Sequence, residues 1–512
     1  MLTAADLGVP DRFNAAVHFV DRHVVEGRGE KVAIECGDDR VTYAQLHERV
    51  NRFGSALRSR FNVGAGERVA LLLLDGPAFA YGFFGAIKIG AIPIPTNTLW
   101  KAADYRYLLN DSGARVLVIS AELLAEFQGV RDSCPSLEHV VIVGGDPDPL
   151  AAMLQEADPD LEAQIVAHDD PAFWLYSSGS TGAPKGCVHL HHDMVVSAEL
   201  VAKGVLGITA DDRCFSVAKL FFAYGLGNAL YFPLAVGATS ILWPGPPTPA
   251  NVYATIERHQ PTLFFSVPTG YGMLLAQDGT PDLSSIRLAV SAGEALPPAL
   301  YERFKQRFGI DILDGIGSTE ALQMFIANRP DAIRPGSSGL LIRGYDARIV
   351  DDDNQPVPAG EIGSLWISGD STCACYWNQP EKTRQTIDGD WLRTGDKYWQ
   401  DADGYFWYAG RSDDMLKVGG LWVSPIEVEN ALIAHPAVQE CAVVGREDRD
   451  RLVKPLAYVV LRAGLAATPG LAAELQQFVR ERLAEYKRPR WVEFLPELPK
   501  TATGKIQRFK LR

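Results

Sequence analysis

The sequence predicts an α/β protein with a large N-terminal domain and a small α+β C-terminal domain. The chain has 512 residues, which is more than one ordinary hydrophobic core accommodates. Short apolar runs alternate with amphipathic stretches through the first two thirds, as is typical of parallel sheets covered by helices. The end of the chain mixes strands and a helix in a compact segment of its own. We therefore predict a large domain over residues 1–411 and a small domain over residues 412–512.

The elements of the large domain are predicted in chain order. Its most apolar stretch runs from Val69 to Pro95 but is interrupted by Asp75, Lys88 and several glycines and prolines. It is therefore predicted as strand, turn, helix and strand, and not as a membrane span. Further strands are predicted at ARVLVIS (114–120), HVVIVGG (139–145), TLFFSV (262–267), RLAVSAG (287–293) and DILDGIG (311–317). Helices are predicted at AELLAEFQGV (121–130) and PPALYERFKQRFG (297–309). The alternation indicates two mainly parallel sheets, with ligands expected at the carboxyl ends of the strands.

The pattern changes after about Gly336. Residues 339–369 contain short strands separated by turn-forming clusters, which predicts a small β-barrel attached to the two sheets. The acidic run VDDDNQPVP within it is expected to be a solvated turn. The C-terminal domain is predicted from the strands ECAVVG (440–445) and LAYVVL (456–461) and from the helical stretch LAAELQQFVRERLAEY (471–486).

Composition narrows the class of function. Lys and Arg number 49 and Asp and Glu number 63, so the formal net charge is −14, and there is no long basic run. This argues against nucleic acid as the main partner. The seven cysteines are scattered and odd in number, which argues against a disulfide framework or a cysteine metal site. The N-terminus lacks the pattern of a signal peptide, so we expect a cytoplasmic protein without a membrane anchor.

The stretch YSSGSTGAPKG, residues 176–186, predicts a phosphate-binding loop. Glycines allow close approach to a phosphate, backbone N–H groups can form an anion nest, and Lys185 adds a positive charge. The P-loop spacing does not fit, because Gly186 follows the lysine where that motif has Ser or Thr. The alternative is an ordinary flexible surface loop. The candidate phosphate contacts are Ser177, Ser178, Gly179, Ser180, Thr181, Gly182 and Lys185.

The order of several motifs resembles the adenylate-forming superfamily of acyl-CoA synthetases, adenylation domains and luciferases. The phosphate loop is followed by SAGEAL (291–296), DGIGSTE (314–320), WLRTGD (391–396), a segment beginning YAGRSDD at Tyr408, and PKTATGKIQR (499–508). The resemblance implies activation of a carboxylate by attack on the α-phosphate of ATP, with Mg²⁺ and a mobile C-terminal domain. Such catalysis depends mostly on positioning and charge stabilisation.

The resemblance also implies roles for single residues. Lys505 would bridge the carboxylate and the α-phosphate, Thr319 would donate to the α-phosphate, and Glu320 would hold Mg²⁺. Taken alone, Lys505 and Glu320 would be ordinary surface charges. Asp413 matches the hinge, and free CoA is favoured as acceptor because no carrier domain follows GKIQRFKLR. The remaining implied nucleotide contacts are Gly293, Glu294, Ala295, Asp314, Gly315, Ile316, Asp396 and Arg411. The implied CoA tunnel consists of Lys417, Gly419, Gly420 and Trp422.

The segment FFAYGLGN, residues 221–228, resembles benzoate-CoA ligases and related aryl-CoA ligases. The resemblance implies an aryl pocket in which Tyr224 forms a flat wall with a hydroxyl at its edge. After GSTE, benzoate ligases usually read Met-Leu-His-Ile, whereas this chain reads Ala-Leu-Gln-Met. Gln323 offers both a donor and an acceptor, so a 2-aminobenzoate or a hydroxybenzoate joins benzoate as an expected substrate. The implied pocket residues are Phe222, Ala223, Tyr224, Gly225, Gly317, Gln323 and Met324.

Three further expectations concern alternatives and partners. The rival activities are a freestanding enzyme that loads an aryl acid onto a carrier protein and a catalytically inactive nucleotide-binding protein. The histidines of HLHHD (189–193) are expected to be structural or surface residues in preference to metal ligands. The sequence allows a homodimer without requiring one.

Overall fold

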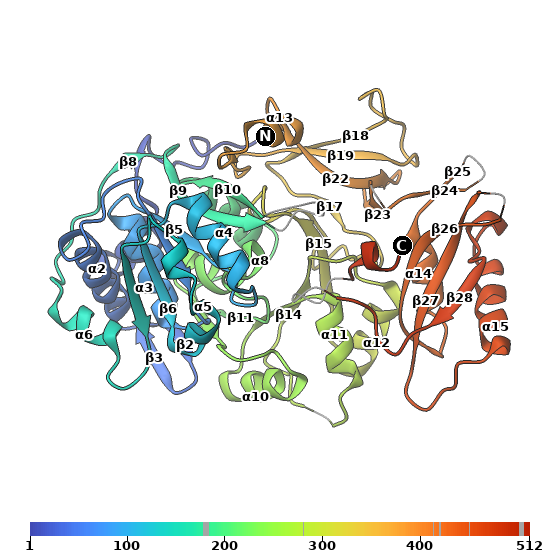
Figure 1. Ribbon diagram of the computed structural model, residues 1–512, viewed down its shortest axis with the longest axis horizontal. Helices are drawn as coiled ribbons and strands as arrows, with labels where there is room; N and C mark the ends of the chain where they lie inside the picture. Colours follow the sequence, from blue (N-terminus) through green and yellow to red (C-terminus); the bar gives the residue numbers. More distant parts are fainter. Residues whose placement is uncertain (178–183, 280, 413, 419–420, 450, 501–505) are drawn as a thin grey trace.

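The computed structural model describes residues 1–177, 184–279, 281–412, 414–418, 421–449, 451–500 and 506–512; for Leu421 and Trp422 it describes the backbone alone. Figure 1 shows two sheets with covering helices on the N-terminal side, a β unit above them, and a separate C-terminal unit drawn in red. This arrangement confirms the predicted α/β class with a large N-terminal and a small C-terminal domain. The boundary between residues 411 and 412 stays a prediction.

The central sheet has nine strands in the order β17-β16-β15-β14-β13-β11-β12-β2-β3. The strands from β15 to β2 pair in parallel, and β3, β16 and β17 add antiparallel edges. The bounds, in sheet order, are Leu340–Leu341, Met324–Ala327, Ile312–Gly317, Leu288–Ser291, Leu263–Ser266, Arg213–Ser216, Thr239–Leu242, Val32–Cys36 and Asp39–Thr42. The predicted strands at 262–267, 287–293 and 311–317 are thus adjacent, so the segments that follow them meet at one edge of the sheet.

A second sheet is fully parallel, in the order β5-β4-β6-β7, with bounds Ile92–Pro95, Arg68–Leu72, Val116–Ser120 and His139–Val143. The apolar stretch from Val69 folds as predicted into β4, helix α3 (Pro77–Lys88) and β5. Lys88 at the end of α3 is almost fully buried, and its Nζ lies 2.7 Å from Asp21 Oδ2. The predicted helix at 121–130 is instead a 3₁₀ turn, Ala121–Leu123, and a one-turn helix, α5 (Leu124–Phe127). Gly129 follows with a φ of 74°, which a continuing helix does not allow.

Most helices of the large domain begin at recognisable caps. The hydroxyl of Thr42 accepts from the backbone N–H of Gln45 at the start of α2, and the Gln45 side chain accepts from Thr42 in return, which is a capping box. Proline opens α6, α10, α11 and α12, where its missing N–H costs nothing. These helices and α4 are Tyr43–Ser59 (α2), Ala102–Ser112 (α4), Pro149–Glu156 (α6), Pro249–His259 (α10), Pro268–Ala276 (α11) and Pro298–Phe308 (α12). Among the described residues, every helix is too short or too polar to cross a bilayer.

Two further sheets are antiparallel, and the second of them lies at the top of Figure 1. One has the order β20-β10-β9, with bounds Cys375–Tyr376, Lys185–Leu190 and Pro171–Ser177. The other has the order β18-β19-β22-β21, with β23 also on β22, and is an open sheet where the sequence analysis expected a small barrel. Its bounds are Asp346–Val350, Gly363–Ser368, Trp391–Gln400, Ile387–Asp388 and, for β23, Phe406–Arg411. Helix α13 (Pro380–Thr386) lies between β20 and β21.

The C-terminal unit has a sheet of its own in the order β26-β27-β28, with bounds Val438–Glu447, Val453–Leu461 and Trp491–Phe494. Helices α14 (Pro425–Ile433) and α15 (Pro469–Arg480) pack on this sheet, and Val428, Val443 and Leu475 are fully buried in its core. The helix predicted at 471–486 ends at Arg480, and a 3₁₀ turn follows at Glu485–Lys487. A hairpin of β24 (Leu416–Val418) and β25 (Leu421–Val423) precedes this sheet, and the chain terminus lies on the side that faces the large domain (Figure 1).

Candidate active site

The predicted phosphate loop connects β9 to β10. The two strands pair antiparallel up to Ser177 opposite Lys185, so the ends of the loop are held together by the hairpin. The ammonium of Lys185 lies over the ring of Tyr376, with Nζ 4.7 Å from the ring centroid. This contact fixes a positive charge at the base of the loop. Ser178, Gly179, Ser180, Thr181 and Gly182 lie outside the described residues.

Tyr376 also contacts the predicted metal ligand. Its hydroxyl donates to Glu320 Oε1 at 2.8 Å, and the backbone N–H of Cys373 donates to the carbonyl of Glu320 at 2.7 Å. The tyrosine is buried, which raises the pKa of its hydroxyl and keeps that hydroxyl a donor. One aromatic side chain thus joins the Lys185 ammonium to the Glu320 carboxylate. The structure brings together a cation suited to phosphate and a carboxylate suited to Mg²⁺.

His189 supports the same segment from β10. Its Nε2 lies 2.9 Å from the carbonyl oxygen of Thr319, and its Nδ1 lies 2.8 Å from Asp193 Oδ2. Both side chains of this His189–Asp193 pair are fully buried. The backbone of Thr319 is therefore fixed by His189 on β10. The next residue, Glu320, is fixed by Tyr376 on β20 and by Cys373 just before that strand.

Asp314 lies on β15, at the edge where the central strands end. The backbone N–H of Leu296 donates to its Oδ2 at 3.3 Å, which ties the predicted nucleotide contacts Gly293, Glu294 and Ala295 to this strand. Among the described residues, Oδ1 is buried without a hydrogen-bond partner. Burial raises the pKa of Asp314 from 3.8 to about 8, so the carboxyl is mainly protonated at neutral pH. A protonated acid can both donate and accept, which suits the edge of a base.

Asp396 and Arg411 face each other across β22 and β23. Arg411 Nη1 donates to Asp396 Oδ1 at 3.0 Å and to the carbonyl of Thr394 at 3.2 Å. Gly395 has a φ of 76°, and a Cβ there would lie 2.9 Å from Arg411 Nη2, so glycine is required for the guanidinium to pack here. The pair predicted to bind ribose is therefore preformed at the end of the large domain.

The predicted aryl segment begins the helix α8 (Ala223–Leu226), which continues as the π-helix η5 (Gly227–Tyr231). The Tyr224 hydroxyl donates to the carbonyls of Val290 at 3.1 Å and Ser266 at 3.3 Å, and its ring packs edge-to-face on Phe265. The sequence predicted this hydroxyl at the edge of the aryl pocket. In the structure it bonds instead to backbone carbonyls of β13 and β14. Tyr224 therefore fixes α8 to the central sheet and offers its ring face.

Gln323 and Met324 follow the metal-ligand segment and reach the same helix. Gln323 Nε2 donates to the carbonyl of Tyr224 and to Asn228 Oδ1, both at 3.4 Å, and its Oε1 accepts from the backbone of Met324 at 3.1 Å. Gly317 pairs with Met324 across β15 and β16. The predicted pocket residues Ala223, Tyr224, Gly225, Gly317, Gln323 and Met324 are thus brought together. The half-buried Phe222 is the N-cap of α8, and its ring packs on that of Phe221 in a tilted arrangement with centroids 4.3 Å apart.

A buried carboxylate holds the connection that leads into α8. Asp75, just after β4, accepts from the backbone N–H of Leu220 at 3.1 Å, and its Oδ2 lies 3.8 Å from Lys219 Nζ. Lys219 also donates to the carbonyls of Trp243 at 2.6 Å and Gly245 at 2.8 Å. Burial raises the pKa of Asp75 to about 6. Residues 219 and 220 are thereby fixed just before the aryl segment.

The residues predicted in the C-terminal unit are described only in part. Lys417 is exposed in the middle of β24, and its backbone pairs with Trp422 on β25. Asp414, beside the predicted hinge, forms an ion pair with Arg512, and Arg508 Nη2 donates to Glu429 Oε2 at 2.7 Å. Lys500 and Ile506, on either side of the predicted catalytic loop, form an antiparallel bridge. Asp413, Gly419, Gly420, Lys505 and the side chain of Trp422 lie outside the described residues.

Comparison with known proteins identifies the family. The sequence profile described as AMP-binding enzyme matches residues 21–377, and the profile of the AMP-binding enzyme C-terminal domain matches residues 427–505. The chain belongs to the AMP-binding enzyme family. The resemblance to adenylate-forming enzymes inferred from the motifs is thereby confirmed.

This AMP-binding enzyme is similar to aryl-CoA ligases over its whole length. It is 52% identical over 514 residues to a benzoate–CoA ligase of Thauera aromatica, covering 100% of this chain and 98% of the relative. The crystal structure of an anthranilate CoA ligase with anthranoyl-AMP is 47% identical, with a TM-score of 0.96 and coverage of 100% of this chain and 98% of that chain. A benzoate CoA ligase from Burkholderia xenovorans LB400 is 45% identical, with a TM-score of 0.91 and coverage of 98% and 100%.

Several residues that shape the site of this AMP-binding enzyme were missed by the sequence analysis. Tyr376, Asp75, His189 and Asn228 each contact a predicted site residue but were given no role at that site. Tyr376 and Glu320 are 56 residues apart, and Asp75 and Leu220 are 145 apart, so no local spacing relates them. The only local signal was the position of Asp75 directly after a buried strand.

Proposed function

We propose that the chain is an ATP-dependent aryl-CoA ligase. It converts benzoate or a substituted benzoate, such as 2-aminobenzoate or a hydroxybenzoate, into its CoA thioester through an aryl-AMP, and AMP and pyrophosphate are released. The observation that carries the proposal is that Tyr376 contacts both the Lys185 ammonium and the Glu320 carboxylate. Gln323, which follows Glu320 in the chain, bonds to Tyr224 in the aryl segment and so joins that segment to the same site. Full-length similarity to benzoate and anthranilate CoA ligases supports the aromatic substrate.

The residues fit a site for Mg²⁺. Glu320 is half-buried, and the bond from Tyr376 occupies part of only one of its two oxygens, so lone pairs remain for a hard cation. When bound, Mg²⁺ would neutralise charge on the phosphates of ATP. Lys185 would bind the same phosphates, and Asp396 with Arg411 would orient the ribose.

The chain's own residues would act in two stages. In the first, the carboxylate of the acid attacks the α-phosphate while Thr319 donates to that phosphate and Lys505 stabilises the developing charge. In the second, the C-terminal domain turns about Asp413, and Lys417, Gly419, Gly420 and Trp422 guide the CoA thiol to the aryl-AMP. Asp314 would meet the adenine edge throughout, together with the segments 293–295 and 315–316.

The proposed partners are small molecules. They are an aromatic carboxylic acid, ATP and CoA, and we place the reaction in the cytoplasm because ATP and CoA are supplied there. A homodimer stays a prediction.

Product analysis with and without CoA tests the function. The enzyme is incubated with ATP, Mg²⁺ and benzoate or 2-aminobenzoate, and the products are identified by mass. We expect aryl-AMP in the absence of CoA, and the aryl-CoA thioester with AMP in its presence. Aryl-AMP that persists unchanged when CoA is added would contradict the ligase and favour an enzyme that loads a carrier protein.

A further inference from the structure

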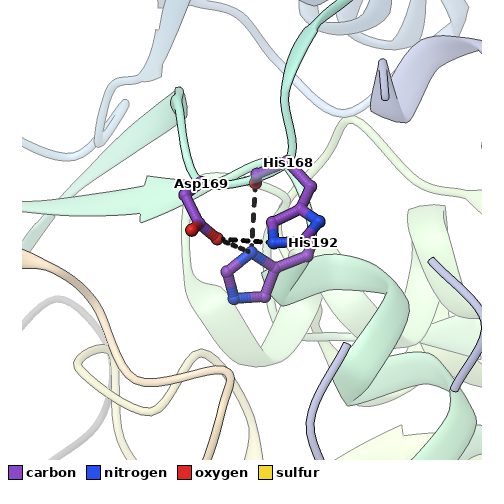
Figure 2. Close-up of side chains that lie close together, drawn as sticks. All are labelled: His168, Asp169 and His192. Atoms are coloured by element: carbon purple, nitrogen blue, oxygen red, sulfur yellow. Dashed lines mark hydrogen bonds and ion pairs between the residues drawn. The ribbon is translucent and has the colours of Figure 1, made fainter. Parts of the chain in front are cut away.

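Three side chains outside the proposed active site converge near the start of helix α7 (Asp193–Ser197). His168 and Asp169 lie between β8 (Val166–Ala167) and β9, and His192 is the residue before α7 (Figure 2). Asp169 Oδ1 lies 2.9 Å from His168 Nε2 and 3.3 Å from His192 Nδ1. All three of these atoms lie within 4.8 Å of one another. Asp169 is a shared neighbour of both rings.

The carbonyl oxygens beside the two rings indicate which ring nitrogens carry protons when the rings are neutral. His168 Nδ1 lies 3.2 Å from the carbonyl oxygen of Pro10, and His192 Nε2 lies 3.0 Å from the carbonyl oxygen of Asp370. A carbonyl oxygen only accepts, so each of these two nitrogens is the donor, and in a neutral ring the other nitrogen is a bare acceptor. The acceptor nitrogens are the two that face Asp169.

When both rings are neutral, the centre of the cluster therefore contains acceptors without a donor. Besides the two nitrogens and the Asp169 carboxylate, the carbonyl oxygen of His168 lies 3.0 Å from His192 Nδ1. Such an arrangement needs a positive charge at its centre. One extra proton on His192 would give its Nδ1 a hydrogen to donate to Asp169 or to the His168 carbonyl, and Asp193 Oδ1 also lies 3.3 Å from its Nε2. That proton would still leave His168 Nε2 as a bare acceptor 2.9 Å from Asp169 Oδ1, whereas one divalent cation bonds to both nitrogens and the carboxylate at once.

We propose that His168, Asp169 and His192 form a binding site for one divalent transition-metal ion of the Zn²⁺ class. Zinc bonds to imidazole nitrogen and carboxylate oxygen are about 2.0–2.2 Å long, so ligand atoms around a tetrahedral ion lie about 3.3–3.5 Å apart. The separations of 2.9 and 3.3 Å are close to that value. The two imidazoles favour Zn²⁺, Co²⁺, Ni²⁺ or Cu²⁺ over Mg²⁺ and Ca²⁺.

The surroundings match those of a metal site. Each histidine donates its second N–H to a backbone carbonyl, the usual way in which ligand rings are oriented. Asp169 is exposed, with 68% of its side chain accessible, whereas His192 is buried at 6%, so an ion can enter from solvent and be held against the protein. The site is separate from Glu320.

A metal ion here would act on structure. Through Pro10 and Asp370 the two rings already contact the N-terminal segment and the loop after β19, so an ion would join both to the β8–β9 turn and to α7. His192 precedes Asp193, the carboxylate that holds His189 beneath Thr319. We therefore expect the ion to stabilise the fold without entering the reaction.

Zinc binding to the full chain tests the proposal. The purified protein is stripped with EDTA and dialysed at pH 7.5 against Zn²⁺ with an excess of Mg²⁺, and bound zinc is measured by elemental analysis. His168→Gln and Asp169→Asn are compared with wild type. The control is His139→Gln, because His139 is also an accessible histidine beside an acid, with its Nε2 3.9 Å from Glu138 Oε2. Asp169→Asn removes one exposed carboxylate and should leave the apoprotein folded, which its circular dichroism checks.

We expect wild type and His139→Gln to hold one tightly bound zinc ion, and the two site variants to bind it at least tenfold more weakly. Zinc should also raise the Tm of wild type and not that of Asp169→Asn. The proposal is overturned if wild type holds no tightly bound zinc ion, in which case the cluster holds protons. It is also overturned if Asp169→Asn and His168→Gln bind zinc as tightly as wild type.

Discussion

The hydroxyl of Tyr376 lies 2.8 Å from Glu320 Oε1, and the same ring carries the ammonium of Lys185 on its face. The tyrosine therefore orients the carboxylate proposed to hold Mg²⁺ relative to the cation proposed to hold phosphate. Neither contact is local in the sequence. Because Tyr376 contacts Glu320 and Lys185, we expect it to act through these two residues without touching the reacting atoms, as a positioning residue.

Tyr376→Phe keeps the ring under Lys185 and removes the bond to Glu320. A hydrogen bond to a charged group contributes about 1.5–3 kcal/mol, so we expect kcat/KM to fall about 10- to 100-fold. The Mg²⁺ concentration that gives half-maximal rate should rise as well, because Glu320 loses its orientation. Tyr253→Phe is the control, since its hydroxyl donates to a remote carbonyl, that of Leu274. An unchanged Mg²⁺ dependence in Tyr376→Phe would contradict the role.

Asp314 should make stability depend on pH. Its pKa is about 8 in the folded chain, whereas the ordinary value for an aspartate, which the unfolded chain should have, is 3.8. The folded state therefore binds the proton more tightly than the unfolded state. The contribution of this proton to the free energy of unfolding is complete below about pH 4, decreases as the pH rises from there, and is lost above about pH 8. In urea unfolding between pH 6 and 8, wild type should lose about 1.4 kcal/mol per pH unit relative to Asp314→Asn, which cannot ionise. Parallel pH curves for the two proteins would show that Asp314 is already ionised.

Asp75 should position the aryl segment. Asp75→Ala removes the acceptor of the Leu220 N–H and leaves Lys219 without its buried carboxylate, so the start of α8 should shift. We expect a KM for benzoate at least tenfold higher, with the KM for ATP little changed. Asp75→Asn keeps an acceptor oxygen and should restore most of the benzoate affinity. If both variants raise the two KM values equally, Asp75 supports the fold in general.

Gln323→His should change the substrate ranking. Gln323 contacts Tyr224 and Asn228 on the helix of the aryl segment, so its side chain determines which groups line that end of the pocket. We expect the ratio of kcat/KM for 2-aminobenzoate to that for benzoate to fall about tenfold or more, because a hydrogen-bonding site discriminates strongly. An identical ranking in the variant would remove Gln323 from the choice of substrate.

Much of the fold could be predicted because it is encoded locally. Residues 114–120 and 262–267 are short apolar runs between turn signals, and both fold as buried parallel strands. The ends of helices were harder to predict. Residues 121–130 have helical periodicity, but they fold as a 3₁₀ turn and a one-turn helix that end before Gly129. The helix from Pro469 ends at Arg480, although apolar residues continue beyond it. Tertiary contacts decide such boundaries.

The site was predictable to the extent that its residues lie in motifs. Glu320, Asp396 and Arg411 each belong to a recognisable string, and the structure pairs the last two directly. Tyr376 is one aromatic residue in CACYWN and has no local signal of its role. His192 was assigned to the HLHHD cluster, but its partners His168 and Asp169 come from another turn 24 residues away. Only the fold brings such residues together.

The most direct test is the rate of pyrophosphate release, measured as kcat/KM with ATP, Mg²⁺ and CoA across a panel of acids. The panel holds benzoate, 2-aminobenzoate, the three monohydroxybenzoates, cyclohexanecarboxylate, cinnamate and a medium-chain fatty acid. An aryl-CoA ligase should prefer benzoate or a substituted benzoate over cinnamate and the fatty acid by about 100-fold or more. A preference for the fatty acid, or equal rates for all of these acids, would contradict an aryl pocket at Tyr224 and Gln323.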